Sequence, residues 1–328
     1  MTISRRPGRR TTLAVVAAAL LTLASGCGSA SKPAASAGGA PVAAAAAAAG
    51  SASASIPVQD VVSAVRPDPA LKAELPAAIA ARGTLSLGTT RPTGLAGLPH
   101  DGVDAAGREV GLDVDLRNAI AAKLGISWQA QYGTFATIIP GAQNGRFDVG
   151  WGNFGVTKAR EQVVDFATYL TDGQAFLGAA GVKTAAIGTL SDLCGYTVAT
   201  SPGSTFQQIL TDGAAECAAA GKPAYRVQYF ADSAPIFLGL ANGKIDIMFG
   251  PTLSLRYDAA HVPGTKFLGQ ISTTPVGVVV AKGSPLAKPI SDAVNALIAD
   301  GSYTKIFTKW GVPDTAIPAS QINPAPTL

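Results

Sequence analysis

Arg160 is the strongest candidate for ligand chemistry in this sequence, because it stands at the expected start of a helix after a sparsely charged loop. The segment reads WGNFGVTKAR over residues 151–160, and Thr157 suits the N-cap position of the helix. Free backbone N–H groups, the positive end of the helix dipole and a guanidinium together favour a carboxylate held by two hydrogen bonds. The alternative is a weak surface ion pair of Arg160 with Glu161 or Asp165.

A second loop with similar chemistry follows the stretch YTVAT, residues 196–200. A Pro-Gly turn leads to Ser204 and Thr205, which offer hydroxyl groups and backbone N–H groups at the start of an amphipathic helix. A simple helix cap is the alternative interpretation. Two such loops in one chain, each after a strand, favour two half-sites that close on one small ligand.

The elements around these loops follow an α/β pattern. Residues 71–83 predict a short helix, and the alternation in residues 84–90 predicts a strand. Apolar residues recur at every fourth position in a helix expected over residues 111–125, and residues 126–132 alternate again as a strand. A strand, a helix and a second strand in succession imply a crossover connection and a parallel sheet.

An internal repeat indicates two similar lobes. GAQNGRFDVGWGNF at residues 141–154 reappears as GLANGKIDIMFGPT at residues 239–252, and in each copy Asn-Gly closes a helix before a strand. The alternative is a helix–strand junction that uses Asn-Gly by convergence, but this would not explain the matching Asp148 and Asp246, which we interpret as turn-capping groups. In open parallel sheets the ligand lies beyond the carboxyl ends of the strands, so both loops should face one cleft.

The start of the chain predicts export and anchoring. Residues 1–26 resemble a secretory signal, with four arginines before an apolar run that is too short to span a bilayer. The run ends in LASGC, which resembles a lipoprotein box in which Cys27 is lipidated; an ordinary signal with a chance cysteine is the alternative. Residues 27–55 are almost entirely Ala, Ser and Gly and predict a flexible tether. We expect a lipid-anchored protein at the extracellular face of the cell membrane.

Charge, cysteine and histidine usage exclude several functions. The formal net charge of +4 comes from the four basic residues of the expected signal, so it gives no argument for nucleic-acid binding. In an exported protein the isolated pair Cys194 and Cys217 predicts a disulfide, with two buried free thiols as the alternative. His100 and His261 lack Cys or carboxylate neighbours at ligand spacing, so we expect no metal site and no cofactor.

Together these segments resemble a known family. GLDVDLRNAIAAKL, residues 111–124, fits the signature of the family 3 solute-binding proteins, the periplasmic or lipid-anchored receptors of polar amino-acid ABC importers. The resemblance covers nearly the whole globular body, in successive segments at residues 135–148, 157–170, 191–205, 240–246 and 300–313. The cysteine pair, with AAGKP after its second member, resembles an actinobacterial branch in particular.

The resemblance implies a two-lobed periplasmic-binding-protein-like fold of type II. Each lobe is then an open, mostly parallel sheet flanked by helices, and two strands cross between the lobes near residues 177–182 and 276–281. Lobe 1 would comprise residues 56–178 and 279–328, completed by the C-terminal helices, and lobe 2 would comprise residues 179–278. We expect a monomer.

The resemblance also implies roles for individual residues. By position, Arg160 would bind the α-carboxylate of the ligand, helped by the backbone and side chains around Asn153 and Gly155. Thr205, after Ser204, would contact the carboxylate from the opposite lobe.

Two departures from the family pattern leave a standard L-amino acid ligand open. Pro251 stands where amino-acid-binding members place an aspartate for the α-ammonium group, and residues 91–101 lack the aromatic that covers the ligand. Trp151 is a candidate replacement, as an apolar wall or as a cation–π face for an amine, and Phe135 is a second candidate wall. Core packing is the alternative for both side chains.

We therefore expect an extracytoplasmic solute-binding receptor of an ABC importer. It would close on a small polar solute, an amino acid or a related carboxylate or amine, and deliver it to a membrane permease. An enzyme of the same fold, such as a dehydratase of cyclic acids, would need an acid or base in the cleft, and we expect no catalytic residue. A cell-surface interaction protein without a transport role is the third hypothesis.

Overall fold

The computed structural model describes residues 56–328; the expected signal, Cys27 and the tether lie outside this range. The strands are β1 Thr84–Thr90, β2 Gly102–Val103, β3 Glu109–Val110, β4 Ser127–Gly133, β5 Val149–Gly155, β6 Val164–Ala179, β7 Thr197–Thr200, β8 Arg226–Tyr229, β9 Ile247–Pro251 and β10 Thr265–Ala281. The helices are α1 Pro69–Ala73, α2 Ala77–Arg82, α3 Leu112–Leu124, α4 Phe135–Gln143, α5 Lys158–Glu161, η1 Leu190–Leu193, α6 Thr205–Asp212, α7 Glu216–Ala219, α8 Ser233–Ala241, α9 Thr252–His261, α10 Ala287–Ala299, α11 Ser302–Lys309 and η2 Pro313–Thr315. Among the helices of residues 56–328, none has the length and apolar character needed to cross a membrane.

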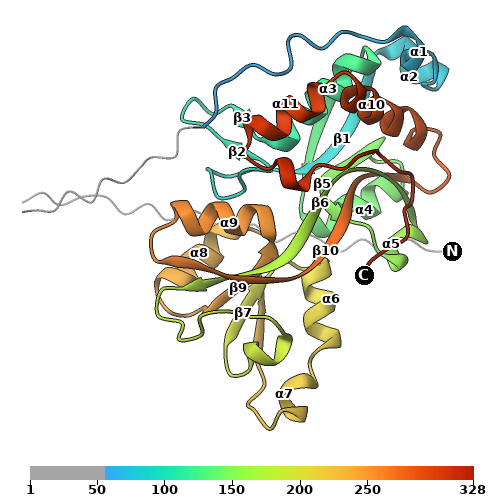
Figure 1. Cartoon of the computed structure of the whole chain (residues 1–328). Coiled ribbons are helices and arrows are strands. Elements are labelled where there is room, and N and C mark those ends of the chain that lie inside the picture. Colours follow the sequence, from blue (N-terminus) through green and yellow to red (C-terminus); the bar gives the residue numbers. More distant parts are fainter. Residues whose placement is uncertain (1–55) are drawn as a thin grey trace, which may run out of the picture. The chain divides into compact units, whose positions relative to one another are not determined.

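Eight strands form one sheet in the order β4-β1-β5-β10-β6-β9-β7-β8 (Figure 1). In one half, β1 is parallel to both β4 and β5, and in the other half β7 is parallel to both β8 and β9. The long strands β6 and β10 run antiparallel in the middle and join the two halves. Each half repeats the same succession of strand, helix, strand, helix and strand, so the expected α/β fold with two related lobes is confirmed.

The two halves have separate hydrophobic cores. Along β6, Leu170 belongs to the core of lobe 1 and Ala175 to the core of lobe 2. Along β10, Leu268 belongs to the core of lobe 2 and Val276 to that of lobe 1. Each strand therefore runs unbroken from one core into the other.

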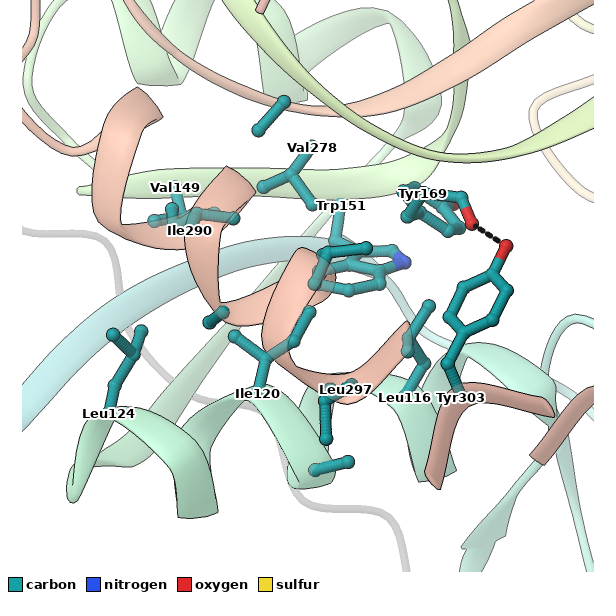
Figure 2. Close-up of a cluster of buried hydrophobic side chains, with 14 of the residues drawn as sticks. Leu116, Ile120, Leu124, Val149, Trp151, Tyr169, Val278, Ile290, Leu297 and Tyr303 are labelled. Carbon is teal, nitrogen blue, oxygen red and sulfur yellow. Dashed lines mark hydrogen bonds between the residues drawn. The ribbon is translucent and has the colours of Figure 1, made fainter. Parts of the chain in front are cut away.

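Helices from the end of the chain complete the core of lobe 1 (Figure 2). The periodic positions of α3, namely Leu116, Ile120 and Leu124, are fully buried against Ile290 and Leu297 of α10 and their neighbours. The hydroxyl of Tyr303 in α11 donates to the carbonyl of Tyr169 in β6 at 2.8 Å. Each fully buried leucine or isoleucine contributes about 1.5–3 kcal/mol of transfer free energy, which holds the strands of lobe 1 in place.

The internal repeat has the predicted local structure in both lobes. Asn144 and Gly145 directly follow helix α4, and Asn242 and Gly243 directly follow α8. The two glycines have φ angles of +70° and +73°, in the left-handed region that a residue without a Cβ atom adopts without strain. In each lobe this turn connects the helix to the strand that follows it, α4 to β5 and α8 to β9.

Asp148 and Asp246 connect strands, and the turn-capping interpretation is wrong for both. The Asp148 carboxylate accepts hydrogen bonds from the backbone N–H and the hydroxyl of Ser86 in β1, at 2.7 and 2.9 Å. The Asp246 carboxylate accepts a hydrogen bond from the backbone N–H of Thr197 in β7 at 2.7 Å. In each lobe the aspartate thus joins the third strand to the first strand, and its role is structural.

The helix expected over residues 71–83 is divided into two. Helix α1 ends at Ala73 and α2 begins at Ala77, because Pro76 lacks a backbone N–H and cannot continue a helix. Gly83, with a φ angle of +67°, ends α2 as expected.

The disulfide between Cys194 and Cys217 is confirmed, with a Cα–Cα distance of 5.5 Å. It joins the end of η1 to α7 on lobe 2. The alternative of two free thiols is therefore wrong.

Candidate functional site

A cavity of about 130 Å³ lies between the two lobes, where β5 and β9 end. The carboxyl ends of parallel strands are where ligands bind in open α/β sheets. The lining consists of Phe135, Gly152, Asn153, Gly155, Arg160, Asp172, Gly173, Gln174, Ser201, Ser204, Thr205, Phe206, Pro251, Thr274 and Val276. All of the ligand-binding residues expected from the sequence, except Trp151, line this cavity.

Arg160 reaches from lobe 1 to lobe 2. Thr157 caps the short helix α5 as predicted, and its hydroxyl oxygen accepts a hydrogen bond from the Arg160 backbone N–H at 3.2 Å. The Arg160 guanidinium donates to the carbonyl oxygen of Gly155 at 2.9 Å and to that of Gly203, in lobe 2, at 3.1 Å. The guanidinium therefore links the backbones of both lobes at the edge of the cavity.

No acidic side chain of residues 56–328 forms an ion pair with Arg160. Asp165, which the sequence offered as a partner, pairs instead with Lys282 at 2.7 Å, and the alternative of a surface ion pair is wrong. Burial lowers the pKa of Arg160 to about 10, so the group stays charged at neutral pH. The guanidinium lies 5.8 Å from the ring centroids of Phe135 and Phe154, which form an apolar wall beside it.

The loop of lobe 2 that faces Arg160 is a capped helix start. The Ser204 hydroxyl accepts from the backbone N–H of Gln207 at 3.2 Å and donates to the carbonyl of Ser201 at 2.6 Å. Gly203 has a φ angle of +75°, and a Cβ atom there would lie 3.1 Å from the Cβ atom of Ala136 in α4. The loop backbone thus packs directly on lobe 1, and the two lobes are in contact beside the cavity.

Trp151 does not line the cavity, and the prediction that it forms a ligand wall is wrong. Its side chain is 1% exposed and packs in the core of lobe 1 beside Tyr169, with the ring centroids 4.7 Å apart (Figure 2). Side chains of a strand alternate between its two faces, so Trp151 points into the core while Gly152 lies at the cavity. Phe135, by contrast, does line the cavity.

Asp172 in β6 is an acidic residue of the cavity that the sequence reasoning missed. It is 4% exposed, and Oδ1 accepts from the backbone N–H groups of Gly173 at 2.7 Å and Leu253 at 3.2 Å. Oδ2 accepts from the Asn153 side-chain amide at 2.8 Å and lies 3.0 Å from His100 Nε2. An aspartate inside the otherwise apolar or neutral strand segment TYLTDGQAF was the signal that could have revealed it.

His100 lies between two carboxylates in space, although the sequence placed none at ligand spacing. Nδ1 is 3.4 Å from Asp113 and Nε2 is 3.0 Å from Asp172, while Tyr169 donates its hydroxyl to Asp113 at 3.3 Å. Burial opposes the charge of the imidazolium, but Asp113 and Asp172 outweigh burial and raise the pKa of His100 to about 10. His100 is therefore positively charged at neutral pH and is not available as a general base.

A second cavity of about 180 Å³ shares Phe135 and Ser201 with the first. The loop after β1, without the covering aromatic, contributes Arg91 and Asp101 to its lining. Burial, and then the nearby Asp113 carboxylate, raise the pKa of Asp101 to about 6. The Arg91 guanidinium stacks 3.8 Å from the centre of the Tyr132 ring.

Two α/β lobes joined by two long strands, with a half-buried arginine at the edge of the cavity between them, define a two-lobed binding protein. The family of bacterial extracellular solute-binding proteins, family 3, matches residues 96–313, and the chain belongs to this family. It is therefore a solute-binding receptor that acts outside the cytoplasm. Within residues 56–328, no group of three or more His, Cys, Asp or Glu residues could hold a metal ion.

Known relatives are amino-acid-binding proteins. The arginine-binding protein ArgT of Corynebacterium glutamicum is 26% identical over 263 residues, which cover 79% of this chain and 84% of the relative. An ancestral arginine-binding protein, solved with bound arginine, is 32% identical with a TM-score of 0.62, over 70% of this chain and 98% of that one. An ancestral amino acid-binding protein described as a precursor of cyclohexadienyl dehydratase is 28% identical with a TM-score of 0.60, over 71% of this chain and 97% of that one. The corynebacterial relative agrees with the expected actinobacterial branch.

Proposed function

We propose that this receptor binds an amino acid or a related small carboxylate in the cavity between its lobes and delivers it to an ABC permease. Arg160 carries the proposal. Its guanidinium is charged and half-buried, has no acidic partner among residues 56–328, and contacts the backbone of both lobes. A ligand carboxylate beside it would receive charge-assisted hydrogen bonds, which would stabilise the closed arrangement of the lobes.

Arginine is the first ligand to test. ArgT and the solved ancestral neighbour are both arginine-binding proteins. In this chain the second cavity, which shares Phe135 and Ser201 with the first, offers the Asp101 carboxylate to a basic side chain. A solute with a carboxylate at one end and a cation at the other therefore fits both cavities.

Isothermal titration calorimetry with arginine and agmatine, which is arginine without its carboxylate, tests the role of Arg160. We expect arginine to bind more tightly than agmatine, and Arg160→Ala to weaken arginine binding by about 100-fold, the value of two charge-assisted hydrogen bonds. Arg146→Ala is the matched control, because Arg146 is exposed and outside the cavity lining, with its guanidinium over the ring of Phe147. Equal binding of arginine to wild type and Arg160→Ala would contradict the proposal.

We further propose that the receptor is held at the extracellular face of the membrane by a lipid on Cys27 after removal of residues 1–26. The sequence LASGC supports this proposal, and both segments lie outside the described residues. Metabolic labelling with a fatty acid tests it: wild type should incorporate the label, and Cys27→Ser should lose it and be released into the medium. Labelling that persists in Cys27→Ser would contradict lipidation at this residue.

We propose that the receptor has no enzymatic activity, although one structural neighbour is described as a dehydratase precursor. The acidic side chain of the cavity, Asp172, is bound to His100 and to the backbone N–H groups of Gly173 and Leu253. Neither Asp172 nor His100 is free to transfer a proton to a ligand. Incubation with a cyclohexadienyl carboxylic acid, followed by absorbance, should show no dehydration; turnover that Asp172→Asn abolishes would contradict this.

A further inference from the structure

The Asn153 side chain holds an unpaired hydrogen-bond acceptor at the wall of the first cavity. Asn153 in β5 has a φ angle of +55°, a left-handed conformation that asparagine tolerates better than most residues. Its Oδ1 atom is inaccessible to solvent and has no hydrogen-bond partner among the described residues. A buried acceptor without a donor is unfavourable, so this atom indicates a missing partner.

Asp172 determines which atom of the Asn153 amide is left unpaired. A carboxylate accepts hydrogen bonds only, so the amide must turn its NH₂ group toward Asp172 Oδ2, which it contacts at 2.8 Å. The other bonds of Asp172, to His100, Gly173 and Leu253, occupy its remaining acceptor positions. Asp172 is therefore a poor direct partner for a ligand but keeps Asn153 Oδ1 available.

His100 holds Asp172 in turn, and the cluster carries a negative charge. His100 lies between Asp172 and Asp113, and each of the three residues is 5% exposed or less. With the imidazole protonated, two carboxylates outweigh one cation by a single negative charge. Of the other titratable groups around it, the Tyr169 hydroxyl is neutral and donates to Asp113, Arg117 and Glu109 form an ion pair with each other, and Asp101 adds to the negative field when it is ionised. The field behind Asn153 therefore favours a positively charged donor in the cavity.

We propose that Asn153 Oδ1, positioned by Asp172 and His100, accepts a hydrogen bond from an ammonium or other N–H donor next to the carboxylate of the bound solute. Pro251 lines the same cavity and offers no side-chain acceptor, whereas Asn153 of lobe 1 holds an acceptor that no described residue uses. The substrate class is then an amino acid whose α-amine is recognised by an amide oxygen over a buried negative cluster. This inference rests on the proposed function.

Deleting the amine from the ligand and the amide from the protein tests the inference. The probes are arginine with its deamino analogue 5-guanidinopentanoate, and glutamine with its deamino analogue glutaramate, titrated into wild type and Asn153→Gly. Glycine accepts the left-handed backbone conformation of this position, so the variant removes the side chain without adding strain. We expect wild type to prefer the amino compound by about tenfold or more, and Asn153→Gly to lose most of this preference while it still binds the carboxylate.

The positioning role of Asp172 has its own readout. In Asp172→Asn the Asn153 amide can turn over, so the preference for the amino compound over its deamino analogue should fall. A purely structural effect would weaken the binding of both compounds equally. Asp314→Asn is the matched control, because Asp314 is exposed and lines neither the first nor the second cavity. An unchanged preference in Asn153→Gly, or a wild type without preference, would overturn this inference and leave the solute-binding proposal standing. If neither arginine, glutamine nor their analogues bind to wild type, the inference fails together with the proposed ligand class.

Discussion

Asp258 in α9 should make this receptor less stable as the pH rises from acid to neutral. Its side chain is 1% exposed, and neither carboxyl oxygen has a hydrogen-bond partner among the described residues. Burial raises the pKa of Asp258 from 3.8 to about 8, so at neutral pH the folded protein keeps this carboxyl protonated. The unfolded chain, whose aspartate has the ordinary pKa, has already released the proton.

The sign and size of the effect follow from proton linkage. Between the two pKa values the folded state binds one more proton than the unfolded state, so the free energy of unfolding falls as pH rises. The loss is about 1.4 kcal/mol per pH unit in this window, or about 3 kcal/mol between about pH 5 and about pH 7. The penalty is absent below about pH 4 and complete above about pH 8.

Asp258→Asn isolates the contribution of this carboxyl group to the pH dependence of stability, because the amide has the same shape and no proton to lose. Chemical denaturation of wild type and variant at several pH values should show a difference in unfolding free energy that grows in favour of the variant by about 3 kcal/mol from about pH 5 to about pH 7. In a thermal scan this corresponds to a shift of roughly 6 °C or more. A difference that stays constant with pH would refute the reasoning, since it would mean that the folded state ionises Asp258 as easily as the unfolded chain does.

Substitutions at three further positions test the packing of the fold and the closure of the lobes. Gly203→Val should weaken ligand binding in calorimetry, because a side chain at this left-handed position would collide with Ala136 across the lobe interface; unchanged affinity would show that the lobes close differently. Cys217→Ala should lower the free energy of unfolding by about 3 kcal/mol, since the disulfide to Cys194 closes a loop of moderate length, and the loss should match that caused by a reductant in wild type. Trp151→Ala should cost about 3–5 kcal/mol of stability in denaturation, while Trp151→Phe should keep wild-type ligand affinity, a result that a ligand-wall role would not allow.

The local features of this fold could be predicted from the sequence because their causes are local. The apolar period that buries Leu116 and Ile120, the Asn-Gly helix ends and the Thr157 cap all depend on residues within one or two helical turns. The repeat of such a unit also predicted two lobes and the edge of the sheet at which Arg160 would lie.

The face on which a side chain lies, and its partners far along the chain, were decided only by the tertiary structure. Whether Trp151 lies in the core or at the cavity depends on which face of the sheet its side chain occupies. A shift of β5 by one residue in register would reverse that face. His100 and Asp172 are 72 positions apart and meet only because β6 passes between the lobes beside the loop after β1. The sequence alone thus determined the family, the lobes and the cationic end of the site. Only the folded chain brought together the buried charges that orient Asn153, because a buried ion cluster is stable only when distant segments supply all of its partners at once.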